Sequence, residues 1–213
     1  FKIEPRLNEI DGVGVSSILL NEFLECRFRQ CPRSQELLDG VLSVDRALDE
    51  GERLSGSKRP DDQWQVLHTP GHASGHIVLW EPVRRGMIGG DMVAAIGTII
   101  VEPPDGHMAT YITQLKRLAS LSPAWLVPAH GAIITEPVAH LEHYVSHRLG
   151  REARVVEALD LGPGELSDVT VRSYPDVPAY LHPLAERSCL AHLIKLEEEG
   201  RATCADGAWA KRP

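Results

Sequence analysis

The clearest strand patterns along the chain are short apolar runs bounded by glycine, proline and charged residues. These runs lie at about 64–69, 76–82, 86–90 and 124–127. Their length and their β-branched and aromatic content are typical of buried strands. The third run ends in Gly89-Gly90-Asp91, and the fourth is followed by Pro128-Ala129-His130-Gly131. The pattern therefore predicts strands that present polar side chains at their ends.

Three longer segments show helical spacing of apolar residues. They lie at about 107–121, 135–161 and 184–199. In the first, Ile112, Leu115 and Leu118 fall on one face of a helix. In the second, Thr135 is a plausible N-cap and Pro137 falls in the first turn. The third is expected to bury a stripe formed by Leu190, Leu193, Ile194 and Leu196.

The last fifty residues form a pattern of their own. Gly162-Pro163-Gly164 ends the long helix and marks a domain boundary. A short segment at 166–174, the helix at 184–199 and two runs around an Asp206-Gly207 turn follow it. Helices followed by a hairpin give the outline of a winged helix. Near the N-terminus, 13–24 fits a strand or a buried helix equally well.

The segment between the first two predicted strands carries three histidines. His68, His72 and His76 are four residues apart, which would align them on a helix. Pro70 and Gly71 exclude that helix, because Pro-Gly favours a tight turn. We therefore expect strand, turn and strand, with His72 at the tip and His68 and His76 as structural neighbours.

Composition narrows the classes of protein. The 213 residues are 43% hydrophobic with a formal net charge of −8, which fits a soluble globular chain and argues against general affinity for phosphate backbones or anionic membranes. No apolar run reaches the roughly 20 residues of a membrane span, and we expect a cytoplasmic protein. The four cysteines form no C-x-x-C pair and are expected to be free, buried thiols.

Three polar residues follow predicted strands, and these are His72, Asp91 and His130. Strand ends are places where a rigid scaffold presents functional side chains. Taken singly, each has a structural alternative, because loop histidines often form hydrogen bonds and Asp after Gly-Gly often forms a turn. As an ordered set, T-P-G-H, G-G-D and P-A-H-G, they indicate a common site.

This ordered set resembles the later metal-binding motifs of the metallo-β-lactamase superfamily. Tyr144-x-x-His147-Arg148-x-x-Arg151-Glu152 on the long helix, followed by a winged helix, is similar to the subgroup of β-lactamase-like endoribonucleases and relatives named hydroxyacylglutathione hydrolases or acyl-carrier thioesterases. The resemblance covers residues from about 38 to 213. It implies an α+β fold, with a partial αβ/βα sandwich at 1–161 and a winged-helix domain at 162–213.

The resemblance also implies roles for individual residues. His72 would complete the first zinc site, Asp91 would bridge two zinc ions, and His130 would belong to the second. Two close metals generate hydroxide near neutral pH, which would attack a thioester, ester, amide or phosphodiester. Four further residues would contact substrate or orient the ligands, and these are His76, Thr98, His147 and Arg148. A plain strand edge is the alternative for Thr98. For the helix residues Tyr144, His147, Arg148 and Glu152 the alternative is a polar seam between helix and second domain.

One motif of that family is absent from the 213 residues. No T-H-x-H-x-D-H run, which supplies four ligands in the family, occurs in the sequence, and His140, His143 and His147 lie in the wrong place to replace it. The chain is therefore predicted to bind zinc weakly and to be catalytically impaired. Phe1 in place of Met favours a chain shortened at its N-terminus, and an internal deletion or a degenerate homologue are the alternatives.

Two other functions stay open beside the hydrolase. One is a metal-free, noncatalytic homologue, and the other is a nucleic-acid-binding module built on the winged helix. Residues 151–213 hold 8 Lys and Arg against 11 Asp and Glu, whereas a DNA-reading wing is normally basic. A small-molecule thioester or ester is the expected substrate, RNA is a possible one, no membrane partner is expected, and the sequence does not indicate an oligomeric state.

Overall fold

The computed structural model describes residues 46–55 and 63–212. The segment at 13–24, for which the sequence left strand and helix open, lies outside the described residues. Cys26 and Cys31 lie outside them as well.

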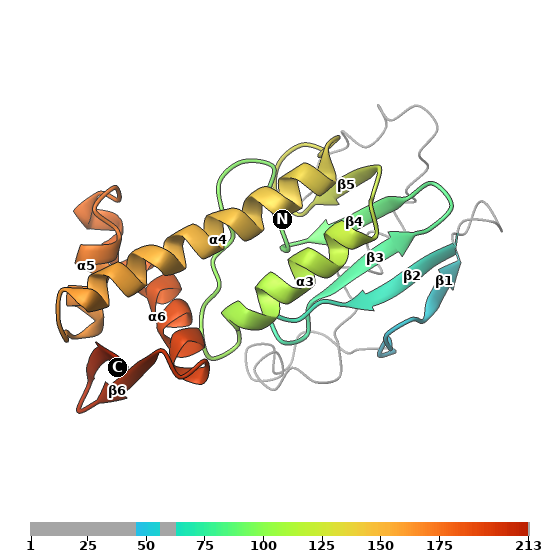
Figure 1. The fold of residues 1–213 in the computed structure, drawn as a ribbon. Coiled ribbons are helices and arrows are strands. Elements are labelled where there is room, and N and C mark those ends of the chain that lie inside the picture. The colour runs from blue at the N-terminus through green and yellow to red at the C-terminus, as the bar shows by residue number, and fades with distance from the viewer. Residues whose placement is uncertain (1–45, 56–62, 213) are drawn as a thin grey trace, which may run out of the picture.

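Five strands form one sheet in the order β1-β2-β3-β4-β5 (Figure 1). They span Arg53–Ser55, Gln63–His68, Ile77–Glu81, Gly86–Gly90 and Trp125–Pro128. Neighbours are antiparallel except for β4 and β5, which run parallel and are connected through helix α3. The four predicted strands are confirmed. β1, which was not predicted individually, has only three residues and therefore no readable period.

Side chains alternate strictly between the two faces of the sheet. In β3, Val78 and Trp80 join the core beneath the helices, whereas Ile77 and Leu79 belong to a second apolar cluster. This is the period of two that a strand imposes. Because both faces are buried, β3 and β4 read as continuous apolar runs.

Two helices cover one face of this sheet (Figure 1). They are α3, Met108–Ser120, and α4, Pro137–Asp160. Ile112, Leu115 and Leu118 of α3 are buried, as the helical spacing predicts. The main core therefore lies between the sheet and these two helices.

The first turn of α4 differs from the expected one. Glu136, not Thr135, occupies the N-cap position, and its side chain makes no capping hydrogen bond. The prediction of Thr135 was wrong by one residue, because Pro137 stands at the first helical position. Its fixed φ and missing N–H suit that position and set the start of the helix.

The C-terminal part folds against the far end of α4. It comprises α5 at Leu166–Ser173, a 3-10 turn η2 at Ala179–Leu181, α6 at His182–Glu198 and the hairpin strands β6 at Ala202–Ala205 and β7 at Ala208–Lys211. This order confirms the predicted winged-helix outline. A separate core holds these elements together and includes Val155, Ala158 and Leu159 from α4. The division at 161/162 stays a prediction.

The two described cysteines differ in their surroundings. Both are free thiols. Cys189 is buried in the core of the C-terminal part, and Cys204 is exposed. The expectation of buried thiols is therefore wrong for Cys204. Along β6 burial decreases from Ala202, which is buried, to Cys204 and Ala205, which are exposed next to the turn of the hairpin.

Candidate functional site

The three residues that follow the predicted strands converge in the structure. Asp91 directly follows β4 and His130 follows β5, so the parallel pairing of these strands brings their carboxyl ends together. His130 Nε2 lies 3.3 Å from Asp91 Oδ1, and His72 Nε2 lies 3.9 Å from Asp91 Oδ2. Two imidazoles therefore flank one carboxylate.

His72 sits at the tip of the turn between β2 and β3, and this turn is tied to the segment before α3. Gly71 O accepts a hydrogen bond from His107 N at 2.8 Å, and Ser74 N donates to Asp105 Oδ1 at 2.9 Å. Gly71 has a φ of +136°, a conformation that favours glycine. The Pro-Gly turn predicted from the sequence thus fixes the position of His72.

The ring of His72 is oriented by a single backbone carbonyl. His72 Nδ1 lies 2.9 Å from Ile100 O, so this nitrogen must carry the proton that the carbonyl accepts. In this tautomer of the imidazole, Nε2 carries the lone pair and points toward Asp91. A carbonyl that receives the other ring N–H is the usual partner of a metal-binding histidine.

His76 holds the backbone of Asp91. Asp91 N donates to His76 Nε2 at 3.0 Å, and the other ring nitrogen, Nδ1, lies 2.8 Å from Thr69 Oγ1. Burial, helped by the neighbouring His72 and His68, lowers the pKa of His76 to about 3, so its ring is neutral at pH 7. The ring of His68 instead bonds Ser74 O at 2.8 Å.

The donor atoms are imidazole nitrogens and carboxylate oxygens, which are types that bind transition metal ions. Two ligand atoms about 2.1 Å from one tetrahedral ion are roughly 3.4 Å apart, which is close to the two distances around Asp91. Asp91 Oδ1 is buried and has no hydrogen-bond partner among the described residues. Within 46–55 and 63–212, however, no group of three or more His, Cys, Asp or Glu side chains is arranged to hold a metal ion. The described residues therefore match part of a centre.

The remaining predicted site residues, Thr98, Arg148 and His147, differ in their burial and in their contacts. Thr98 is exposed and its Oγ1 accepts a hydrogen bond from Arg148 at 2.7 Å, while Arg148 itself is buried. His147 is half-buried, and burial together with the charges of Arg148 and Arg151 lowers its pKa to about 4. Among the hydrogen bonds and ion pairs of the described residues, none joins His147 to Asp91.

Two residues of α4 touch the segment after Asp91: Tyr144, which the sequence marked as part of the motif on the long helix, and His140, which sequence reasoning missed. His140 Nε2 donates to Ala94 O at 2.9 Å, and Tyr144 Oη accepts from Ala94 N at 3.0 Å. The signal was present in the spacing, because His140, Tyr144 and Arg148 are four residues apart and share one helix face.

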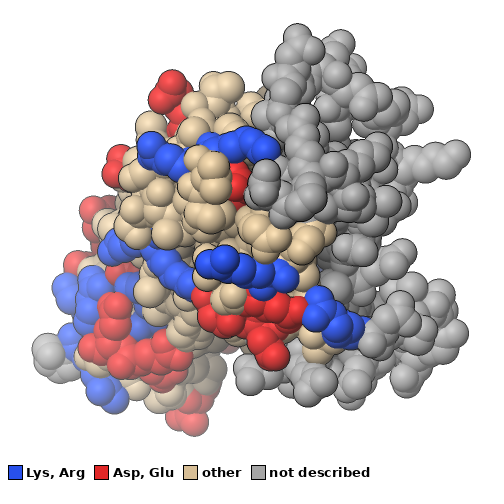
Figure 2. All heavy atoms as spheres, turned by 90° about the vertical axis from the view of Figure 1, so that its right-hand side faces the viewer, with Lys and Arg blue, Asp and Glu red and all other residues tan. Residues whose placement is uncertain are grey.

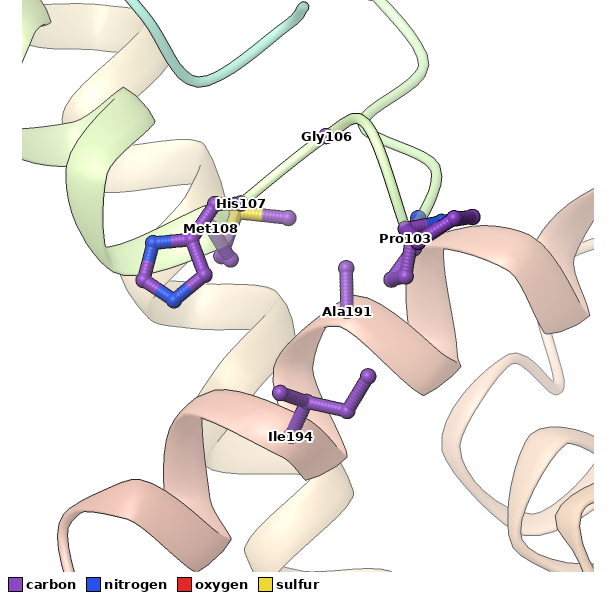
Figure 3. Close-up of a pocket in the computed structure, with 7 residues that line it drawn as sticks. Pro103, Gly106, His107, Met108, Ala191 and Ile194 are labelled. Atoms are coloured by element: carbon purple, nitrogen blue, oxygen red, sulfur yellow. The ribbon is translucent and has the colours of Figure 1, made fainter. Parts of the chain in front are cut away.

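A small apolar cavity of about 240 Å³ lies between the segment before α3 and helix α6 (Figure 3). Ala191 and Ile194 of α6 face Pro103 and Met108 across it. His72, Asp91 and His130 are not among the residues that line this cavity. The cavity is thus separate from the group around Asp91.

Charged side chains of both signs lie next to one another on the described part of the face drawn in Figure 2. The described residues do not present a continuous basic surface on this face, which is the right-hand side of Figure 1. None of the helices in the described ranges is long and apolar enough to cross a membrane.

Gly71→Ala is expected to destabilise the fold by about 2 kcal/mol or more. A Cβ at this position would lie 2.4 Å from Tyr111 Cα and 2.5 Å from Tyr111 N, so the clash is with the backbone of α3 and not with a flexible side chain. Gly97→Ala is the matched control, because Gly97 also has a positive φ of +87° but an open environment. Its cost is expected to be roughly 1 kcal/mol. Urea unfolding measures both, and equal losses would contradict the steric argument.

Two family models match the sequence. The model of the metallo-beta-lactamase superfamily matches residues 34–130, and that of the beta-lactamase associated winged helix domain matches residues 166–209. The first range contains all three motifs around Asp91, and the second contains α5, α6 and most of the hairpin.

Curated relatives cover much of the chain. A beta-lactamase-like protein 2 homolog of Drosophila melanogaster is 33% identical over 64% of this chain and 46% of its own length. The probable metallo-hydrolase YqjP of Bacillus subtilis is 30% identical over 80% of this chain and 55% of its own length. The chain therefore spans about half the length of these relatives. A shorter match, 30% identical over 45% of this chain and 28% of the relative, is to an atrochrysone carboxyl ACP thioesterase of Aspergillus novofumigatus.

Solved structures resemble the fold. A beta-lactamase domain protein from Burkholderia ambifaria superposes with a TM-score of 0.71 at 22% identity, over 84% of this chain and 56% of that one. A metallo-beta-lactamase family protein from Thermus thermophilus gives 0.69 at 23% identity, over 80% of this chain and 56% of that one. The predicted α+β fold class is confirmed.

Proposed function

Since the chain belongs to the metallo-beta-lactamase superfamily, we propose that it carries part of the centre of a zinc-dependent hydrolase, with His72, Asp91 and His130 as ligands. The observation that carries the proposal is the convergence of these residues: two imidazole nitrogens lie 3.3 and 3.9 Å from the oxygens of one carboxylate. Within the described residues Asp91 Oδ1 has no hydrogen-bond partner, and His72 Nε2 approaches Asp91 Oδ2 at 3.9 Å.

The roles of these residues follow from their contacts. Bound zinc would supply hydroxide near neutral pH by lowering the pKa of a coordinated water. His72 is held in the required tautomer by Ile100 O, and His76 anchors the backbone of Asp91. His130 Nε2 stands on the solvent side, with 73% of its side chain exposed. Each imidazole nitrogen thus lies beside a different oxygen of the same carboxylate.

The proposed substrate is a small-molecule thioester or ester. A thioesterase among the relatives supports this class, and so does the acidic balance of 151–213, which disfavours a nucleic-acid backbone. We assign residues 162–213 to a winged-helix domain beside the hydrolase domain. Its proposed role is to help define the substrate.

Zinc titration tests the assignment of the ligands. After dialysis the chain is expected to retain well under one equivalent, because the donors around Asp91 are too few for tight binding. A weak site is expected to remain measurable by calorimetry at high zinc concentration and to disappear in His72→Ala. Hydrolysis of thioesters by this chain is expected to be slow.

His68→Ala is the matched control, because His68 lies in the same turn region but bonds Ser74 O. It is expected to keep the weak site. Two tightly held equivalents in the unaltered chain would contradict the count of ligands. Equal zinc binding by His72→Ala and His68→Ala would contradict the role of His72.

A further inference from the structure

We propose that Arg148 is a positioning residue for the centre around Asp91: from the middle of α4 it holds the segment 94–101 in the shape that aims His72 at Asp91. The inference rests on the proposed function of His72 and Asp91. It extends that function to a side chain that touches neither of them.

The segment 94–101 contacts the ring of His72 and the backbone of His130. It follows Asp91, contains no helix or strand, and leads toward α3. Ile100 O accepts the proton of His72 Nδ1 at 2.9 Å, and Ala95 N donates to His130 O at 3.0 Å. A change in the shape of this segment would therefore move or release groups on both sides of Asp91.

Helix α4 holds this segment along one face. His140 and Tyr144 bind Ala94, and Tyr144 Oη also lies 3.0 Å from Gly97 O. Arg148, one turn further along, completes the row. Irregular backbone lacks the regular hydrogen bonds of a helix or sheet, so its carbonyl groups need other partners. These side chains of α4 supply the hydrogen bonds.

Arg148 makes the contacts nearest to His72. Its Nη2 donates to Thr98 Oγ1 at 2.7 Å and to Ile99 O. Ile99 immediately precedes Ile100, so fixing one carbonyl constrains the peptide that carries the next. The carbonyl that sets the tautomer of His72 is therefore one residue away from the guanidinium.

The surroundings of Arg148 favour this local role over a general stabilising one. Only 2% of the residue is exposed, and its guanidinium lies 5.5 Å from the centre of the Tyr111 ring. No ion pair between Arg148 and a carboxylate is present in the described ranges. A buried cation without a carboxylate is costly, and here its hydrogen bonds go to the segment that orients His72.

Arg148→Met tests the proposal, with Arg151→Met as the matched control. Arg151 lies on the same helix and also stacks on a ring, that of Tyr174 at 4.9 Å, but it pairs with Asp176 in the C-terminal part. Both changes remove a guanidinium and keep an apolar stem. Only Arg148→Met removes hydrogen bonds from the segment beside His72.

The first measurement is the tautomer of His72 in the metal-free chain, observed by long-range proton–nitrogen NMR at about pH 8.5, two units above the ordinary His pKa. The unaltered chain and Arg151→Met are expected to show the proton on Nδ1. Arg148→Met is expected to show a mixture with Nε2. Its zinc affinity is expected to fall about 10-fold, the usual cost of losing a residue that orients a ligand.

Thr98→Val keeps the test decisive if Arg148→Met does not fold. Thr98 is exposed, so its replacement spares the core while removing one acceptor of Arg148.

In Thr98→Val, a smaller shift of the His72 tautomer in the same direction supports the proposal. An unchanged tautomer in both folded variants, or an equal shift in Arg151→Met, overturns it. A shift confined to Arg148→Met without zinc binding by any form supports the positioning role and contradicts the proposed metal function.

Discussion

Asp91→Asn is expected to lower the zinc affinity of this chain by at least about 100-fold, because residues that merely orient a ligand already cost roughly 10- to 100-fold. Both imidazoles approach Asp91, and in the part of the chain that the structure describes its buried Oδ1 has no hydrogen-bond partner. The amide has nearly the same shape and lacks the negative charge that a divalent cation requires. The same change is expected to abolish any zinc-dependent hydrolysis. Calorimetric titration with zinc measures the loss of affinity.

Asp105→Asn is the control for the loss of one negative charge near the centre. Asp105 Oδ1 accepts a hydrogen bond from Ser74 N, and an asparagine oxygen can accept the same bond. Its effect on zinc affinity is expected to stay within about threefold, because it removes no donor from the group around Asp91. If the two variants bind zinc alike, the bridging role assigned to Asp91 is wrong.

Much of the fold could be predicted because local patterns coincide with the core. The strands that cover both faces of the sheet read as continuous apolar runs, and the buried face of α3 follows the 3.6-residue period. β1 escaped prediction because three residues carry no period. The start of α4 was misplaced because the rule for N-caps competed with the stronger constraint from Pro137.

The candidate site was predicted at the points where strands end. His72, Asp91 and His130 are each marked by turn residues in the sequence, and the structure brings them together. The contacts of Tyr144 and Arg148 with the segment after Asp91 could not be predicted. They join residues about 50 positions apart, and the segment itself has no period that would orient its carbonyls.

Helix α4 connects the two parts of the molecule with successive polar residues. Arg148 faces the segment beside the candidate centre, and Glu152, one turn later, faces α6 and the hairpin. The predicted polar seam between the helix and the second domain therefore holds for Glu152. A carboxylate buried at this junction is expected to contribute strongly to the docking of the C-terminal part.

Glu152→Gln is expected to lower the free energy of unfolding by about 3 kcal/mol at pH 7, because removing one partner of a buried ion pair leaves the other charge uncompensated. Glu152 is 5% exposed; its Oε2 lies 2.6 Å from Lys195 Nζ and its Oε1 lies 3.0 Å from Arg201 Nη1. Glu199 also pairs with Lys195, so Lys195 keeps one carboxylate partner in the variant. The expected loss is therefore at the lower end of the range for a broken buried ion pair. Urea unfolding followed by circular dichroism measures the difference.

The effect of Glu152 is also expected to depend on pH. Burial alone would raise the pKa of its carboxyl, but His192, Lys195 and Arg201 outweigh burial and lower the pKa to about 2. The unfolded chain has the ordinary value near 4.5, so the stabilising contribution is complete above about pH 4.5 and disappears as the pH falls toward 2. Glutamine does not titrate. The difference in unfolding free energy between the two forms should therefore shrink across this window.

Asp160→Asn serves as the control for this pH dependence. Asp160 lies on the same helix and pairs with Lys211, but half of its side chain is exposed, so the pair is expected to contribute less than about 1 kcal/mol. Protonation of other groups at low pH would change the unfolding free energy of both variants. Loss of the buried Glu152 carboxylate would change the pH dependence of Glu152→Gln alone. If the Glu152→Gln difference stays constant from pH 7 to pH 3, the charge of Glu152 does not stabilise the junction. In that case packing and the remaining contacts, such as that of Arg151 with Asp176, hold the C-terminal helices against α4.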